Sequence, residues 1–367
     1  MTGRYLRHDM IDWFDQAIVS QSKAIVIGAG AVGNEVIKSL VLLGVGQIHV
    51  CDFDLIEIHN LTRSVLFREE DVGQPKAQVA CERARQLDPN VHITFTYGDF
   101  WDDLSLSQIK HFDAVYCCVD NFEARIRSNL LCRLAGVDLI NVGIDSRACV
   151  VEVFPLGAGS NVACYECHLP HSVYQRLSQR YSCGHLKKVS FIEKKIPTTI
   201  VTSSIAASFA CSEGLRLAIE GGAKEASRIF VDTINGTSSK ITMDKNAECA
   251  CCSRIENKVN TFAAQPIISD ETQGLDRAIQ IIASDPILVG YRIGETYTSV
   301  FRKASEFDSD FPAQVSDDPG AVDLDIRDSF TAEELIGAAG GIPMPCKFVM
   351  ANVDNCTLVL EFIKEEI

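Results

Sequence analysis

Two pairs of cysteines have the spacing of metal ligands. Cys164 and Cys167 are separated by two residues, and so are Cys249 and Cys252. Four thiolates in two such pairs suit tetrahedral Zn²⁺, and a complete set of protein ligands leaves no position for a catalytic water. The sequence therefore predicts a structural zinc site, with a redox-active cysteine pair as the alternative. Cys251 could replace Cys252, although the two-residue spacing favours Cys249 with Cys252.

A glycine-rich loop is the second feature with chemical meaning. Gly28, Gly30 and Gly33 follow the apolar run 24–27 and precede a stretch with helical spacing. Such a loop lets the backbone approach a phosphate closely, and the helix N-terminus favours an anion. Asp52, at the end of the next predicted strand, can accept hydrogen bonds from ribose hydroxyls. Alone, this motif fits a nicotinamide or flavin dehydrogenase about as well as an ATP-dependent enzyme.

Charged residues after neighbouring strands favour ATP. Arg63 and Lys76 follow the second predicted strand, and Asp120 with Asn121 follows a later one. A dehydrogenase does not need two cations and an acid at this place. An enzyme that splits ATP does, because cations offset charge on the β and γ phosphates and a carboxylate holds Mg²⁺.

The elements that position these residues alternate between strand and helix. This β-α-β order predicts an α/β fold, doubly wound, with a mostly parallel sheet and helices on both faces. Strands are predicted at 24–27, 48–51, 91–97, 114–119, 138–142 and 148–154, and helices at 32–43, 75–87 and 121–135.

The later part of the chain has a different pattern. A long helix is predicted from Pro197 to Ile219, followed by a hairpin of residues 229–233 and 240–243. Two large regions are expected: residues 1–256 with a crossover loop at 168–196, and a small C-terminal α+β unit at 257–367. Within the C-terminal unit, helices are predicted at 272–283 and from Thr331, and a closing hairpin at 347–353 and 357–362.

Composition limits the classes of partner. A net charge of −15 and a pI near 5.0 argue against nucleic acid and anionic membranes as partners, since both are polyanions. The N-terminal residues do not resemble a signal peptide, and no apolar stretch is long enough to cross a bilayer, so a soluble cytoplasmic protein is expected. Cysteines in or beside apolar segments are predicted to be buried hydrophobic residues: Cys51, Cys117, Cys118, Cys132 and Cys149.

Taken together, the motifs resemble the ubiquitin-activating (ThiF/MoeB/HesA) superfamily, which includes the bacterial ThiF and MoeB adenylyltransferases. The resemblance spans roughly residues 4–255, and it implies a Rossmann-like fold. Its motifs are Arg4-Tyr5-x-Arg7, GAGAVG from Gly28, Asp52-Phe53-Asp54, Asn60-Leu-x-Arg63, Pro75-Lys76, and Asp120-Asn121-x3-Arg125-x3-Asn129.

The resemblance implies a role for each motif. It implies that ATP is bound by the glycine loop together with Asp52, Asp54, Asn60, Arg63, Lys76, Asp120 and Asn121. Within this set Asp52 would bind the ribose, Arg63 and Lys76 the triphosphate, and Asp120 the Mg²⁺. Arg7 would reach the ATP of a neighbouring subunit, which implies a homodimer. The expected reaction is adenylation of the C-terminal carboxylate of a small ubiquitin-like protein that ends in glycine.

The crossover loop has a candidate catalytic cysteine. In many relatives a cysteine in this loop forms a thioester with the activated protein, and here Cys183 lies near His185 and several lysines, which can lower a thiol pKa. The segment from Ile196 to Thr199 then opens a helix, as in the activating enzyme for the modifier Ufm. Relatives usually have the cysteine closer to that helix, and Cys183 could also be a metal ligand. An enzyme that only adenylates would not need it.

Other functions share part of this pattern. An adenylating enzyme that modifies a ribosomal peptide, as in microcin pathways, would have every motif. A non-catalytic scaffold subunit would not need Arg63, Lys76 and Asp120. By analogy of position alone, the C-terminal unit would recruit a conjugating enzyme.

Overall fold

The structure is a computed structural model. It describes residues 3–158, 161–174, 197–222, 225–249, 251–253 and 255, together with the strands at 258–263, 287–289, 292–293, 296–297, 302–303, 348–353 and 356–361. The chain divides into two compact units: residues 1–165 with 194–245, and residues 166–193 with 246–367.

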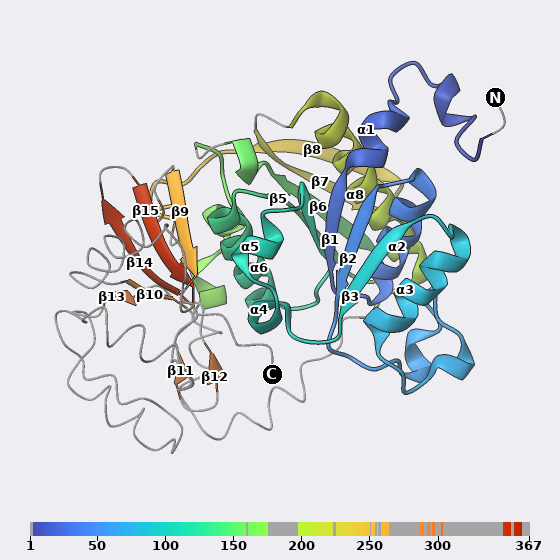
Figure 1. The fold of residues 1–367 in the computed structure, drawn as a ribbon, viewed down its shortest axis with the longest axis horizontal. Helices are drawn as coiled ribbons and strands as arrows, with labels where there is room; N and C mark the ends of the chain where they lie inside the picture. The colour runs from blue at the N-terminus through green and yellow to red at the C-terminus, as the bar shows by residue number, and fades with distance from the viewer. Residues whose placement is uncertain are drawn as a thin grey trace, which may run out of the picture. The chain divides into compact units, whose positions relative to one another are not determined.

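The first unit is built on an eight-stranded sheet in the order β3-β2-β1-β4-β5-β6-β7-β8 (Figure 1). The first five strands pair in parallel, and β6, β7 and β8 continue the sheet in antiparallel fashion. The predicted doubly wound α/β fold is therefore confirmed. The strands are β1 (Lys23–Ile27), β2 (Gln47–Cys51), β3 (His92–Thr96), β4 (Ala114–Cys117), β5 (Asp138–Ile144), β6 (Ala148–Phe154), β7 (Ala226–Asp232) and β8 (Thr237–Met243).

Helices cover the two faces of this sheet. α2 (Ala31–Leu43) packs against α3 (Lys76–Leu87) and α8 (Ile200–Glu220), whereas α5 (Leu106–Ile109) packs against α6 (Phe122–Ala135), which contacts β4 and β5. The apolar side chains of α2, α3 and α8 form one buried core with the strands. α2 ends where Gly44 adopts the left-handed conformation, with φ +81°.

Most predicted boundaries agree with the structure to within a few residues. The long helix expected from Pro197 begins instead at Ile200, because Thr199 caps it and forms a reciprocal capping box with Thr202. The short helices α1 (Gln16–Gln21), α4 (Phe100–Asp103) and α5 were not predicted, since four to six residues are too few to show a helical period.

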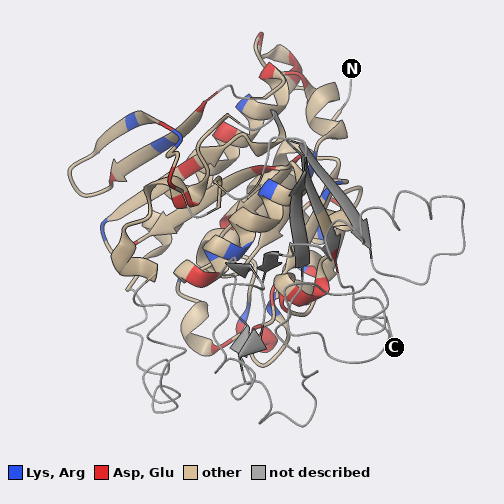
Figure 2. Cartoon of the chain, turned by 90° about the vertical axis from the view of Figure 1, so that its left-hand side faces the viewer, with Lys and Arg blue, Asp and Glu red and all other residues tan. Residues whose placement is uncertain are grey.

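Opposite charges are interspersed over the first unit rather than gathered by sign (Figure 2). Several of them pair across elements: Arg147 with Asp232, and Lys240 with Glu213. Among the described residues, no helix is long and apolar enough to span a bilayer.

The second unit contains a five-stranded sheet in the order β13-β10-β14-β15-β9. The predicted closing hairpin is confirmed as β14 (Phe348–Val353) and β15 (Cys356–Glu361), which pair antiparallel. β9 (Lys258–Ala263) pairs with β15 in parallel. The remaining strands are β10 (Ile287–Val289), β13 (Arg302–Lys303), and the separate pair β11 (Arg292–Ile293) and β12 (Thr296–Tyr297). The helices predicted at 272–283 and from Thr331 lie outside the described residues.

Candidate nucleotide site and cysteine cluster

The order of the sheet fixes where a ligand can bind. The chain passes from β1 outward to β2 and β3, then returns to place β4 on the other side of β1. Open α/β sheets bind ligands at the carboxyl ends of their strands, where the strand order reverses in this way. Gly28 follows β1 at this point, and Asp120 follows β4. The glycine loop and Asp120 therefore lie at the carboxyl ends of two neighbouring strands, β1 and β4.

Each glycine of the loop has a different steric role. Gly28 turns the chain with φ +91°, a conformation that other residues rarely adopt. A Cβ at Gly33 would lie 1.8 Å from the carbonyl oxygen of Gly28, so only glycine lets α2 approach the loop. A Cβ at Gly30 would meet no atom within 4 Å. Gly30 therefore leaves open space at the N-terminus of α2, where a phosphate is favoured.

This difference gives a matched pair of variants. Gly33→Ala is expected to lower the free energy of unfolding by about 2–4 kcal/mol, because its Cβ would collide with backbone. Gly30→Ala is expected to leave the stability within about 1 kcal/mol of wild type and to weaken ATP binding by about 10-fold or more, because the methyl group occupies the ligand's space. Urea unfolding and calorimetric titration with ATP measure the two effects. Unchanged ATP affinity in Gly30→Ala would contradict this reading of the loop.

Asn34 also holds the loop, and the sequence analysis missed it. The side chain is fully buried; its amide donates to the Ala29 carbonyl oxygen at 2.6 Å, and its own oxygen accepts from the Leu66 N–H at 2.9 Å. It thereby joins the glycine loop to the segment that contains Arg63. The available signal was a polar residue on the apolar face of a predicted helix, since buried amides need partners.

Asp52, Asp54 and Lys76 form a chain of hydrogen bonds that begins at the glycine loop. Asp52 accepts from the Ala29 N–H at 2.6 Å and from the Asp54 N–H at 2.7 Å. Asp54 in turn accepts from the Lys76 ammonium group at 2.7 Å. Burial raises the pKa of the Asp52 carboxyl, and the positive charge of Lys76 opposes that rise. The structure thus brings together three residues that the sequence assigned to one site.

Asn60 and Arg63 lie in the turn after β2. Asn60 is buried, and its side-chain oxygen accepts from the Glu57 N–H at 2.9 Å, which completes a capping box around the turn. The half-buried Arg63 donates to the His59 carbonyl oxygen at 2.8 Å. Asn60 therefore shapes the turn from which Arg63 extends.

Asp120 and Asn121 join β4 to α6. Asp120 is exposed, and Asn121 caps α6 by accepting from the Ala124 N–H at 2.8 Å while donating to Asp120 at 3.3 Å. Arg125 donates to the carbonyl oxygens of Val119 and Val142, so it fixes the backbone just before Asp120. The backbone on both sides of Asp120 is therefore held by hydrogen bonds, while its carboxylate is exposed.

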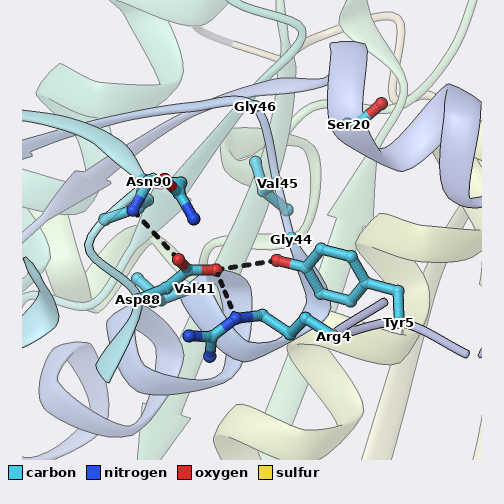
Figure 3. Close-up of a pocket in the computed structure, with 10 residues that line it drawn as sticks. Arg4, Tyr5, Ser20, Val41, Gly44, Val45, Gly46, Asp88 and Asn90 are labelled. Carbon is cyan, nitrogen blue, oxygen red and sulfur yellow. Dashed lines mark hydrogen bonds and ion pairs between the residues drawn. The ribbon is translucent and has the colours of Figure 1, made fainter. Parts of the chain in front are cut away.

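The N-terminal segment is anchored far from the loop of its own chain. Arg4 and Tyr5 both contact the Asp88 carboxylate, at 3.3 Å and 2.9 Å, beside a cavity of about 280 Å³ (Figure 3). The Tyr5 ring also packs on Gly44, at the C-terminus of α2, whereas the glycine loop lies at the N-terminus of the same helix. The 13 residues of α2 span about 20 Å. Arg7 is exposed on this segment and is not brought to the glycine loop of its own chain.

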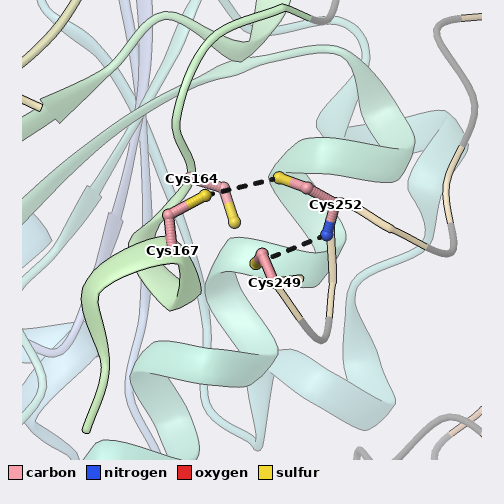
Figure 4. A group of neighbouring side chains, drawn as sticks. All are labelled: Cys164, Cys167, Cys249 and Cys252. Carbon is pink, nitrogen blue, oxygen red and sulfur yellow. Dashed lines mark hydrogen bonds between the residues drawn. The ribbon is translucent and has the colours of Figure 1, made fainter. Parts of the chain in front are cut away.

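The four predicted metal ligands come together. The sulfur atoms of Cys164, Cys167, Cys249 and Cys252 all lie within 4.8 Å of one another, and all four residues are buried (Figure 4). The Cys167 and Cys252 sulfurs are 3.8 Å apart. Two ligands of a tetrahedral zinc with bonds of about 2.3 Å are separated by about 3.8 Å, so the donor set and its spacing fit Zn²⁺. Cys251 is buried but is not one of these four residues, so the structure brings Cys252 rather than Cys251 to the cluster.

The other cysteines of the first unit are mostly core residues. Cys51, Cys117, Cys132 and Cys149 are buried, as predicted, while Cys118 is partly exposed to solvent. Burial raises the pKa of the Cys149 thiol to about 11. Cys183, the candidate catalytic cysteine, lies outside the described residues.

Comparison with known proteins decides the family. A model of the ThiF family matches residues 5–252. The chain belongs to the ThiF family. The resemblance inferred from the motifs is therefore confirmed over about two thirds of the sequence.

Two relatives show how this ThiF-family chain compares with characterised proteins. It is 35% identical over 150 residues to the SUMO-activating enzyme subunit uba-2 of Caenorhabditis elegans, which covers 41% of this chain and 25% of the relative. It is 28% identical over 240 residues to the sulfur carrier protein adenylyltransferase of Thermus thermophilus, covering 65% and 84%. The chain thus spans about a quarter of the SUMO-activating subunit.

The fold also matches solved structures. The crystal structure of Escherichia coli MccB with ATP superposes with a TM-score of 0.55 and 21% identity, covering 69% of this chain and 75% of MccB. At this identity the likeness shows a shared fold.

Proposed function

We propose that this ThiF-family protein is an ATP-dependent adenylating enzyme that activates the C-terminal carboxylate of a small ubiquitin-like protein. The observation that carries the proposal is the meeting of the glycine loop, the Asp52–Asp54–Lys76 chain and Asp120 at the carboxyl ends of β1, β2 and β4. The tail carboxylate attacks the α-phosphate of ATP, an acyl-adenylate forms, and pyrophosphate leaves.

The residues at the carboxyl ends of these strands supply what this reaction needs. Backbone N–H groups at the start of α2 can donate to a phosphate anion, and the Asp52 carboxylate can accept from the ribose hydroxyls. Lys76 and Arg63 offset the charge that develops on the leaving pyrophosphate. Asp120 would hold Mg²⁺, which supplies further neutralisation of the phosphates when bound. Asn60 and Asn121 act by holding the turns that present Arg63 and Asp120.

The proposed substrate class rests on the relatives. A SUMO-activating subunit and a sulfur carrier adenylyltransferase both act on small proteins by name, and both are more similar in sequence than MccB. A ribosomal peptide is the alternative substrate. Mass spectrometry after incubation with ATP separates the two: a ubiquitin-like protein ending in glycine should gain one AMP, and a free peptide of its last residues should not. AMP transfer only to short peptides would favour the alternative.

We further propose that Arg7 acts in the site of a partner subunit, because its anchored segment lies about 20 Å from the glycine loop of its own chain. Arg7→Ala and Asp120→Asn should each be inactive alone. A mixture of the two should regain activity, because a mixed dimer has one site with both native residues. Exchange of pyrophosphate into ATP measures the recovery. Mixed dimers that form yet remain inactive would contradict action across subunits.

A transfer step on Cys183 and recruitment of a conjugating enzyme by the C-terminal unit remain part of the proposal. If Cys183 takes the acyl group, a thiol-sensitive adduct with the modifier should form in wild type and be absent in Cys183→Ala, which should still form the acyl-adenylate. The adduct is resolved on a gel without reducing agent. An adduct that still forms in Cys183→Ala would show that another cysteine carries the thioester.

A further inference from the structure

The ion pair between Lys76 and Asp54 is unequal in its exposure. The Lys76 side chain is 11% exposed, whereas the Asp54 side chain is 54% exposed. Within the described part of the chain, Asp54 is the one hydrogen-bond partner of the Lys76 ammonium group, at 2.7 Å. A buried ammonium group therefore depends on a carboxylate that is already half in solvent.

The difference in exposure means that Asp54, rather than Lys76, is the member of the pair that another group can replace. Removing the counter-ion from a buried charge is costly unless another anion replaces it. Releasing Asp54 costs little, because its carboxylate can be hydrated where it stands. An incoming phosphate can thus take the place of Asp54 beside Lys76 without leaving either charge buried and unpaired.

Asp52 is held by backbone hydrogen bonds, so a phosphate cannot displace it in the same way. Both of its oxygens accept backbone N–H groups, one from Ala29 and one from Asp54. The Lys76 N–H also donates to the Asp54 carbonyl oxygen at 2.9 Å. The backbone of this segment therefore stays in place when the Asp54 side chain moves, and Lys76 remains beside the glycine loop.

We propose that Asp54 is an exchangeable counter-ion, which pairs with Lys76 and holds it in position until a phosphate anion of the nucleotide displaces it. Asp54 then opposes anion binding rather than contributing to it. The identity of the anion as ATP rests on the proposed function, but the exchange itself needs only a polyphosphate.

The test uses Asp54→Asn, which keeps the shape of the side chain and removes its charge, with inorganic pyrophosphate as the probe and no added magnesium. The variant should have a lower Tm than wild type without ligand. It should bind pyrophosphate about 3- to 10-fold more tightly, since no carboxylate competes for Lys76. Pyrophosphate should therefore raise the Tm of the variant more than that of the wild type.

Two further variants make the result specific. Asp71→Asn weakens another partly buried ion pair, with Arg83 at 3.0 Å, so it should lower the Tm without changing pyrophosphate affinity. Lys76→Ala should bind pyrophosphate weakly, and adding Asp54→Asn to it should give no gain, because the two effects share one contact.

The outcomes separate this inference from the proposed function. Weaker pyrophosphate binding by Asp54→Asn would overturn the counter-ion role and make Asp54 a direct contributor to the ligand site. Tighter binding by Asp54→Asn in a protein that fails to exchange pyrophosphate into ATP would support the counter-ion role while removing the adenylation proposal.

Discussion

Asp120→Asn is expected to lower ATP–pyrophosphate exchange by about 100-fold or more, because it removes the carboxylate proposed to hold Mg²⁺ against the phosphates. The folded state should be almost unaffected. Asp120 is exposed, and its carboxylate accepts a long hydrogen bond, 3.3 Å, from the Asn121 amide. Thermal unfolding should therefore match wild type, and the loss should appear in the rate of exchange at saturating ATP.

A matched control lies at the other end of the same strand. Asp113 precedes β4 at the amino edge of the sheet, where its carboxylate accepts from the Lys23 N–H at 2.8 Å. Asp113→Asn removes one negative charge from the same protein, far from the proposed site, and should retain full exchange. Equal loss of exchange in the two variants would show that net charge or folding, rather than position at the carboxyl edge, explains the effect.

Loss of the cysteine cluster is expected to have the largest effect on stability. Each chain should contain one zinc ion, and Cys164→Ser or Cys252→Ser should abolish it while lowering the free energy of unfolding by about 3–5 kcal/mol, since metal binding and folding are coupled. Elemental analysis and urea unfolding measure the two effects. The four sulfur atoms lie within 4.8 Å of one another and are buried, so one serine leaves an incomplete ligand set.

Cys251→Ser is the control for this experiment. Cys251 is buried beside the cluster but is not one of its four members. The variant should lose some stability, because a hydroxyl replaces a buried thiol, and it should keep its zinc. A wild-type protein without zinc after purification in metal-containing medium would contradict the metal assignment and favour the redox alternative.

The framework of the site was predictable because its signals are local. Parallel strands buried on both faces appear as short apolar runs, and Gly28, Gly30 and Gly33 stand between the first such run and a helical period. The paired spacing of the cysteines identified the cluster for the same reason. The mostly parallel sheet with helices on both faces then followed from the β-α-β alternation.

The contacts that hold the site in place were not predictable, because they join distant residues. Asn34 bonds to the segment after β2, and Arg125 bonds to the backbone of β5 and of the segment after β4. The pairing of Lys76 with Asp54 spans 22 residues, and the family resemblance implied only that both belonged to a nucleotide site. A motif shows which residues meet a ligand, but the partners of each side chain depend on packing.

The most direct test of adenylation is ATP–pyrophosphate exchange by the wild-type protein with and without candidate ubiquitin-like proteins. Each candidate is compared with a copy that lacks its final glycine, so that only the position of the carboxylate changes. The proposed function predicts exchange that requires an intact tail and disappears in Asp120→Asn. No exchange with any tail, in a protein that binds ATP, would contradict it.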